Sequence, residues 1–132
     1  MNLKKFKYIS VDVLIGEKTT LTGNLDTESA VKIDGTVHGD ITSLKEVIIS
    51  ETATVEGNVR ADNLIIAGRL FGDVTVKEQL VIKSSGSLEG NAETGSLVIE
   101  VGGSFSGMNR SVTKEEAIEE NSSDAETDNT EA

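Results

Sequence analysis

Eleven residues decide the fold, and they read Val31-Lys-Ile33-Asp-Gly35-Thr-Val37-His-Gly39-Asp40-Ile41. Apolar side chains alternate with polar or small ones, which is the periodicity of a β-strand. Each alternating piece is short, and glycine separates it from the next. Glycine permits positive φ, so a glycine followed by aspartate is typical of a sharp corner. The stretch predicts short strands joined by tight corners.

The same pattern recurs along the middle of the chain. A glycine that is followed by Asn or Asp and has an apolar residue two positions before it occurs five times, at Gly23, Gly39, Gly57, Gly72 and Gly90, and Gly107, followed by Met, is a degenerate sixth copy. The spacings are 16, 18, 15, 18 and 17 residues, an average of about 16.8. An apolar pair at i and i+2 lies in each repeat, at Val13/Ile15, Val31/Ile33, Val47/Ile49, Leu64/Ile66, Leu80/Ile82 and Leu97/Ile99. Self-similarity at a nearly fixed period indicates a repeat architecture.

One repeat is too small to bury a core alone, but it fits one coil of a β-solenoid in which neighbouring coils bury one another. The second residue of the pair is Ile in all six repeats, as a continuous internal ladder requires. We therefore predict an all-β fold, a right-handed parallel β-helix of about six coils. Coils about 4.8 Å apart give a rod roughly 25–30 Å long.

The coil length favours the right-handed form. Left-handed hexapeptide helices repeat an aliphatic residue every six positions, and the variation between 15 and 18 residues does not fit that strict grid. At the corners, we expect Asn and Asp to tolerate unusual backbone angles and to bond to their own backbone. Their alternation along the stack separates like charges, in the order Asn24, Asp40, Asn58, Asp73 and Asn91.

Charge divides the 132 residues into three segments. Residues 1–10 are basic and apolar, residues 11–110 contain all 13 glycines, and residues 111–132 are acidic with few large apolar side chains. The last segment cannot bury enough surface to offset its chain entropy, so we expect it to be disordered. We expect the short N-terminal segment to be disordered as well. No signal-peptide pattern follows the basic start. The absence of Cys and of long apolar runs favours a cytoplasmic protein.

Nucleic acid is an unsuitable partner for this composition. The net charge of −11 opposes phosphate backbones, and four aromatic residues leave little surface on which bases can stack.

Catalytic, nucleotide and metal motifs are weak. Gly16 to Thr20 resembles the end of a phosphate-binding loop but lacks its upstream glycine. His38 is the single histidine, and the repeat places it outward, as expected for a solvated surface residue. Glu56 and Glu89 share that outward position two coils apart, without the aromatic platform that a sugar-binding site would use. We predict no catalytic residue, cofactor or metal.

The stretch from Val31 to Ile41, together with Leu14-Ile-Gly-Glu17, resembles the bactofilins, a family of bacterial cytoskeletal proteins. The resemblance covers roughly Asp12 to Asn109. It implies a six-coil right-handed β-helix and filaments that form without nucleotide by joining like ends. It also implies attachment to the cytoplasmic membrane through the N-terminal segment, and scaffolding in cell shape, wall synthesis or motility.

Three groups of residues are candidates for contacts. End coils of a solenoid carry unpaired backbone groups, so we expect the polymerisation interface at Val11, Val13, Ile15 and Phe105, although Phe105 could instead plug its own core. Phe71 is predicted to lie outward, as a lateral or partner contact or as an isolated surface aromatic. The membrane contact is predicted at Leu3, Lys4, Lys5, Phe6, Lys7 and Tyr8, with a solubilising tail as the alternative.

The sequence thus predicts a cytoskeletal scaffold at the inner face of the cell membrane that polymerises with itself and binds no nucleotide or nucleic acid. Two alternatives remain open. One is a β-helix enzyme, either an acyltransferase or a polysaccharide-active protein. The other is a monomeric β-helical adaptor. The client proteins are not predicted.

Overall fold

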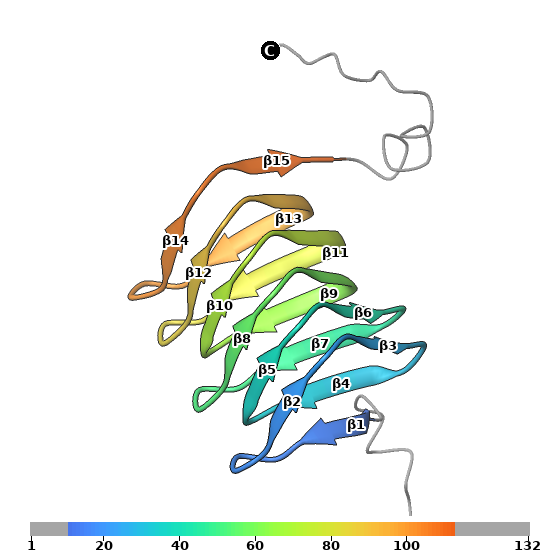
Figure 1. The fold of residues 1–132 in the computed structure, drawn as a ribbon. Coiled ribbons are helices and arrows are strands. Elements are labelled where there is room, and N and C mark those ends of the chain that lie inside the picture. The colour runs from blue at the N-terminus through green and yellow to red at the C-terminus, as the bar shows by residue number, and fades with distance from the viewer. Residues whose placement is uncertain (1–10, 113–132) are drawn as a thin grey trace, which may run out of the picture.

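The computed structural model describes residues 11–112, and these form strands and turns without a helix. The strands stack in parallel as about six coils of a β-solenoid (Figure 1). The predicted all-β parallel β-helix is confirmed. Each coil contributes one strand segment to each of three faces.

Face one contains β1, β4 and β7 together with the carboxyl-terminal halves of three longer strands. Their bounds are β1 (Val11–Ile15), β4 (Ala30–Ile33), β7 (Glu46–Ile49), β9 (Val59–Ile66), β11 (Val74–Ile82) and β13 (Ala92–Ile99). Face two is a six-stranded sheet of β2 (Thr20–Thr22), β5 (Thr36–His38), β8 (Thr54–Glu56), β10 (Arg69–Phe71), β12 (Ser87–Glu89) and β14 (Ser104–Ser106). Face three consists of the amino-terminal halves of β9, β11 and β13 with β3 (Leu25–Thr27), β6 (Ile41–Ser43) and β15 (Asn109–Ser111).

The core is built from ladders of equivalent residues. The predicted isoleucine ladder is present, because Ile15, Ile33, Ile49, Ile66, Ile82 and Ile99 pair in register from coil to coil. Side chains in the middle coils are fully buried, as Ile33 and Ile49 show with 0% exposure. Burying one such side chain contributes about 1.5–3 kcal/mol, so neighbouring coils stabilise each other through continuous apolar contact.

The glycine corners between faces two and three serve two purposes. Gly39, Gly57 and Gly72 have φ of 155°, 154° and 152°. Residues other than glycine rarely adopt such backbone angles. A Cβ on Gly57 would also lie 2.0 Å from the carbonyl oxygen of Gly39 in the preceding coil. The corner therefore requires glycine for close stacking as well as for its backbone angle.

The residues after these glycines form a hydrogen-bonded ladder between coils. The Asn24 Oδ1 accepts from the Asp40 N–H at 2.9 Å, and the Asp40 Oδ1 accepts from the Asn58 N–H at the same distance. Asn58, Asp73 and Asn91 continue the series, which ends on the N–H of Met108. We expected these side chains to bond to their own backbone, and that expectation was wrong. Stacking places the next coil's N–H within reach, and this bond links successive coils.

The turns between faces one and two differ in length. Four residues connect the strands at 16–19, 50–53, 83–86 and 100–103, whereas two residues suffice at 34–35 and 67–68. The core ladders on either side keep their register despite this change. Much of the variation in repeat length is therefore absorbed along one edge of the rod.

Replacing a mid-stack corner glycine should destabilise the rod more than replacing the first one. Gly23 has φ of 131°, but a Cβ added there would have no atom within 4 Å, whereas one on Gly57 would meet a backbone oxygen. Gly23→Ala should cost about 1–3 kcal/mol from backbone strain. Gly57→Ala should cost clearly more, because the coils must also separate. Urea unfolding followed by circular dichroism compares the two variants. Equal losses would show that φ alone explains the corner.

Candidate assembly surfaces

The C-terminal end of the rod exposes side chains that are buried in every middle coil. Ile82 is 0% exposed, but Ile99, its ladder neighbour in the last coil, is 42% exposed. Phe105 stacks on the fully buried Leu88 and is itself only partly buried against the core. The last coil therefore presents apolar surface that another coil would cover.

The N-terminal end has a similar but less open surface. Val11 is 36% exposed and Val13 is partly buried, while Ile15 is 7% exposed and belongs to the core. Of these three predicted interface residues, Val11 and Val13 offer side-chain surface. Ile15 lies in the first coil but packs inward on Ile33. The predicted interface role of these residues stays a prediction.

Among residues 11–112, strand edges without a paired neighbour accompany both apolar ends. In the six-stranded sheet, β2 and β14 are the outer strands, and β1 and β15 end the path of the larger sheet. Backbone N–H and C=O groups on such edges are ready to pair with another chain. Each end thus combines apolar side chains with free backbone hydrogen-bonding groups, which suits stacking on a further coil.

Phe71 lies on face two, halfway along the rod. It is 37% exposed, and its ladder neighbours on either side are Glu56 and Glu89. A ring between two carboxylates is an isolated apolar feature. Its role in a lateral or partner contact stays a prediction.

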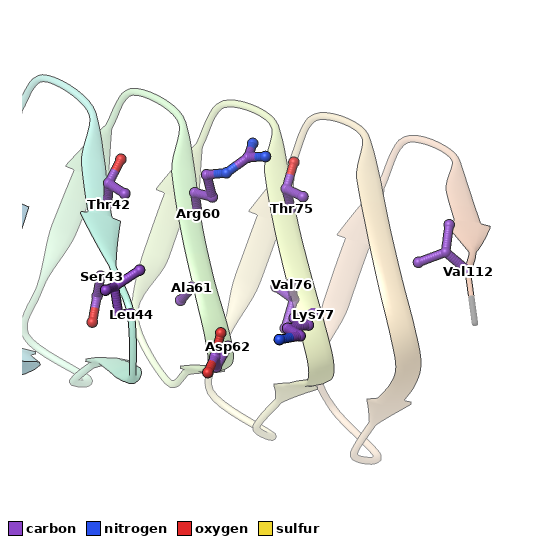
Figure 2. Close-up of a pocket in the computed structure, with 10 residues that line it drawn as sticks. All are labelled: Thr42, Ser43, Leu44, Arg60, Ala61, Asp62, Thr75, Val76, Lys77 and Val112. Carbon is purple, nitrogen blue, oxygen red and sulfur yellow. The ribbon is translucent and has the colours of Figure 1, made fainter. Parts of the chain in front are cut away.

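Face three contains a groove of about 530 Å³. Figure 2 shows Arg60 between Thr42 and Thr75 on three successive coils. Ser43, Leu44, Ala61, Asp62, Val76, Lys77 and Val112 complete the lining. Ser43 has a hydroxyl group of the kind that serves as a nucleophile in serine enzymes. This hydroxyl donates to the Ser29 carbonyl at 2.7 Å and accepts from the Lys45 N–H at 2.9 Å. Its hydrogen bonds give it a structural role at a turn.

Other polar groups also have structural partners. The His38 Nδ1 lies 3.0 Å from the Glu56 Oε1 on the outer surface. A hydrogen bond from the Ser50 side chain lowers the pKa of Asp34, against the opposing effect of desolvation; Lys32, with Nζ 3.3 Å from Oδ1, lowers it further. Burial raises the pKa of Glu46.

Metal-binding and membrane-spanning features are absent from the described part of the chain. Within residues 11–112, no three His, Cys, Asp or Glu side chains gather in a way that could hold a metal ion. The same residues form no helix long and apolar enough to cross a membrane. The predicted membrane-contact residues, Leu3 to Tyr8, lie outside the described residues.

Residues 13–110 match the family model for bactofilin, which is described as polymer-forming and cytoskeletal. The chain belongs to the bactofilin family. A solved structure, a cryo-EM reconstruction of Thermus thermophilus bactofilin double helical filaments, is similar with 26% identity and a TM-score of 0.68. The similarity covers 76% of this chain and 98% of the Thermus chain. No curated protein matches this bactofilin.

The structure also shows end residues that sequence reasoning missed. Val101 is 97% exposed and Met108 is 75% exposed in the last coil of this bactofilin. A signal was present for both. Val101 occupies a turn position where earlier four-residue turns have Glu17, Glu51 and Ser84, and Met108 replaces the Asn or Asp of every earlier corner. An apolar residue in the last repeat, at a position that is polar in the earlier repeats, was the sign of an end surface.

Phe105→Arg should shorten filaments of this bactofilin, whereas Phe71→Arg should leave their length unchanged. The first change places a cation in the apolar end surface, where an unpaired buried charge costs about 3–5 kcal/mol. The second makes the same chemical change away from both ends. Negative-stain microscopy measures filament length, and circular dichroism checks folding. Long filaments of a folded Phe105→Arg variant would show that Phe105 merely plugs its own core.

Proposed function

We propose that this bactofilin polymerises end to end, without nucleotide, into filaments that scaffold other proteins at the inner face of the cell membrane. The observation that carries the proposal is the contrast between buried middle coils and exposed apolar end coils, as in Ile82 and Ile99. Stacking a further coil on each end would bury this surface and pair the free strand edges. Within residues 11–112, this apolar surface is exposed and these strand edges have no paired strand.

The corner ladder favours joints between like ends. It ends at Met108, whose side chain offers no oxygen to a following coil. A head-to-tail joint would therefore leave the Asn24 N–H without the acceptor that every later corner has. A joint between two identical ends does not depend on continuing this series, because a two-fold axis pairs each surface with its own copy. Two such joints, one at each end, build a continuous filament.

Two filament strands wound together are part of the proposal. The similar Thermus protein forms double helical filaments. Pairing of this kind stiffens a thin rod and adds a second set of contacts along its length. We extend it to this chain because the similarity covers almost the whole Thermus chain.

Membrane attachment is proposed for residues 1–10. Lys4, Lys5 and Lys7 would each contribute about 1 kcal/mol near an anionic leaflet, and burial of Phe6 would add about 1.5–3 kcal/mol. One such segment binds weakly. A filament presents many segments together, so each further contact is effectively intramolecular and attachment becomes stable. Shape, wall synthesis and motility are the processes that such a scaffold could serve.

The two alternatives lead to different expectations. A β-helix enzyme should form discrete particles with a cleft that holds reactive groups, and a monomeric adaptor should remain a single rod at any concentration. The groove on face three has Asp62 as its carboxylate and a serine already engaged in structural hydrogen bonds. The end surfaces support the polymer over both alternatives.

Polymerisation should survive complete removal of nucleotide and divalent metal. The sequence contains no complete phosphate-binding loop, and the proposed end contacts are apolar. Purified protein treated with apyrase and EDTA should give filaments of unchanged number and length in electron micrographs. Filaments that disappear after this treatment and return with ATP and magnesium would refute nucleotide independence. Discrete particles under all conditions would instead support one of the alternatives.

Deleting residues 1–8 should leave filaments intact but release them from anionic vesicles. Co-sedimentation with vesicles of anionic or neutral lipid measures binding. Because filaments can pellet without vesicles, a flotation assay separates vesicle-bound protein from filaments that sediment alone. Phe105→Arg should also lose vesicle binding although its N-terminal segment is unchanged, because avidity is lost. Raising the salt concentration should weaken the lysine contribution through screening. Equal vesicle binding by the deletion and the full chain would show that this segment is a solubilising tail.

A further inference from the structure

The three faces of the rod differ in the side chains that they turn outward. Face two turns out mainly polar residues, such as Thr36, His38 and Glu56. The outward positions of face three hold Thr42, Arg60, Thr75 and Glu93 in successive coils. Face one is different, because its outward positions in four successive coils hold Ile48, Ile65, Val81 and Val98.

This outward row, called here the aliphatic row, runs parallel to the rod axis. It consists of Leu14, Lys32, Ile48, Ile65, Val81 and Val98, which pair in register from coil to coil. Ile48, Ile65 and Val81 are partly exposed between fully buried neighbours on the same strands. At its ends, Val98 is 41% exposed and Leu14 is 62% exposed. Lys32 is the one polar member of the row. Solvent-facing strand residues are usually polar, so an aliphatic row requires an explanation.

The charges beside the row do not suit an anionic membrane. Lys32 and Lys83 are paired with Asp34 and Glu100 at 3.3 and 3.2 Å, so neither is a free cation. Glu46 lies on the strand of Ile48 and adds a negative charge. A lipid surface would gain apolar contact but no net electrostatic attraction. A neutral or identical apolar surface fits better.

We propose that the aliphatic row of face one is the surface along which two filaments of this chain pair. The occupant is a second copy of the same row. The inference rests on the proposed end-to-end assembly and identifies the residues that hold its two strands together. Face two with Phe71, and face three with its groove, then remain free on the outside of the paired filament.

The direction of the row supports this occupant. Because it follows the stacking axis, rods joined end to end would align their rows into one apolar line with the repeat of the filament. A second filament of the same chain has the same axial repeat and could match this line throughout. One short row of partly exposed aliphatic residues falls well short of the roughly 1,200 Å² that a specific interface between free subunits buries. Pairing should therefore depend on many subunits acting together.

The test uses outward substitutions within the row. Ile65→Lys and Val81→Lys place a charge in the row, and Lys32 shows that the row accepts lysine within a folded coil. Thr75→Lys is the matched control, since Thr75 also points outward from β11 but on face three. Mass per unit length, measured by dark-field electron microscopy, reports pairing, and filament length reports the end contacts.

The expected result is a two-fold fall in mass per unit length for Ile65→Lys and Val81→Lys, with long filaments retained, and no fall for Thr75→Lys. If the lysine variants fail to fold by circular dichroism, the double variant Ile65→Thr with Val81→Thr decides, because threonine keeps the β-branched shape and removes apolar surface. That variant should also give single filaments.

Other outcomes overturn the inference and are separable from the proposed function. Paired filaments of folded Ile65→Lys would place the contact elsewhere, and unpairing by Phe71→Arg alone would place it on face two. Single filaments of the unchanged protein would refute pairing but leave end-to-end assembly standing. If the unchanged protein forms single filaments and Ile65→Lys abolishes their binding to vesicles, the row would be assigned to the membrane. An unchanged protein that forms no filaments would refute the proposed function itself.

Discussion

The close stacking of each coil on the one before it is the constraint on which the rest of the structure depends. A parallel ladder fixes the spacing of neighbouring coils, so equivalent residues must share one position and one neighbour environment. This is why Gly57 has no room for a side chain beside the carbonyl oxygen of Gly39, and why isoleucine recurs in every coil. It also explains the ends of the described rod, because the surface of the last coil, which is suited to receive another coil, remains apolar.

Much of this could be predicted from the sequence because the repeat reports the same environment six times. The glycine corners, the inward pairs and the isoleucine ladder were each visible as a periodic pattern. The inter-coil bond from the Asp40 N–H to Asn24 was not, since it joins residues 16 positions apart that become neighbours only after coiling. The aliphatic row was missed for another reason. The periodic pattern drew attention to positions i and i+2, whereas Ile48 and Ile65 lie between those positions.

Burial separates two functions that share one strand. In β11, Leu80 and Ile82 hold the coil together, while Val81 between them is available for contact with another molecule. In the proposed pairing, strand alternation lets a short repeat encode both folding and assembly without competition between them. The same logic holds at the ends, where Phe105 packs on Leu88 on one side and forms part of the proposed contact surface on the other.

The unequal turns between faces one and two have a consequence for what a filament can display. Two-residue and four-residue turns occur side by side without disturbing the adjacent ladders, so chain length at this edge is uncoupled from coil spacing. A peptide inserted at a four-residue turn such as 50–53 would extend away from the axis and leave the stack unchanged. Repeated in every subunit, it would form a regular array along the polymer, which makes this edge the natural place for epitopes, tags or docking sequences.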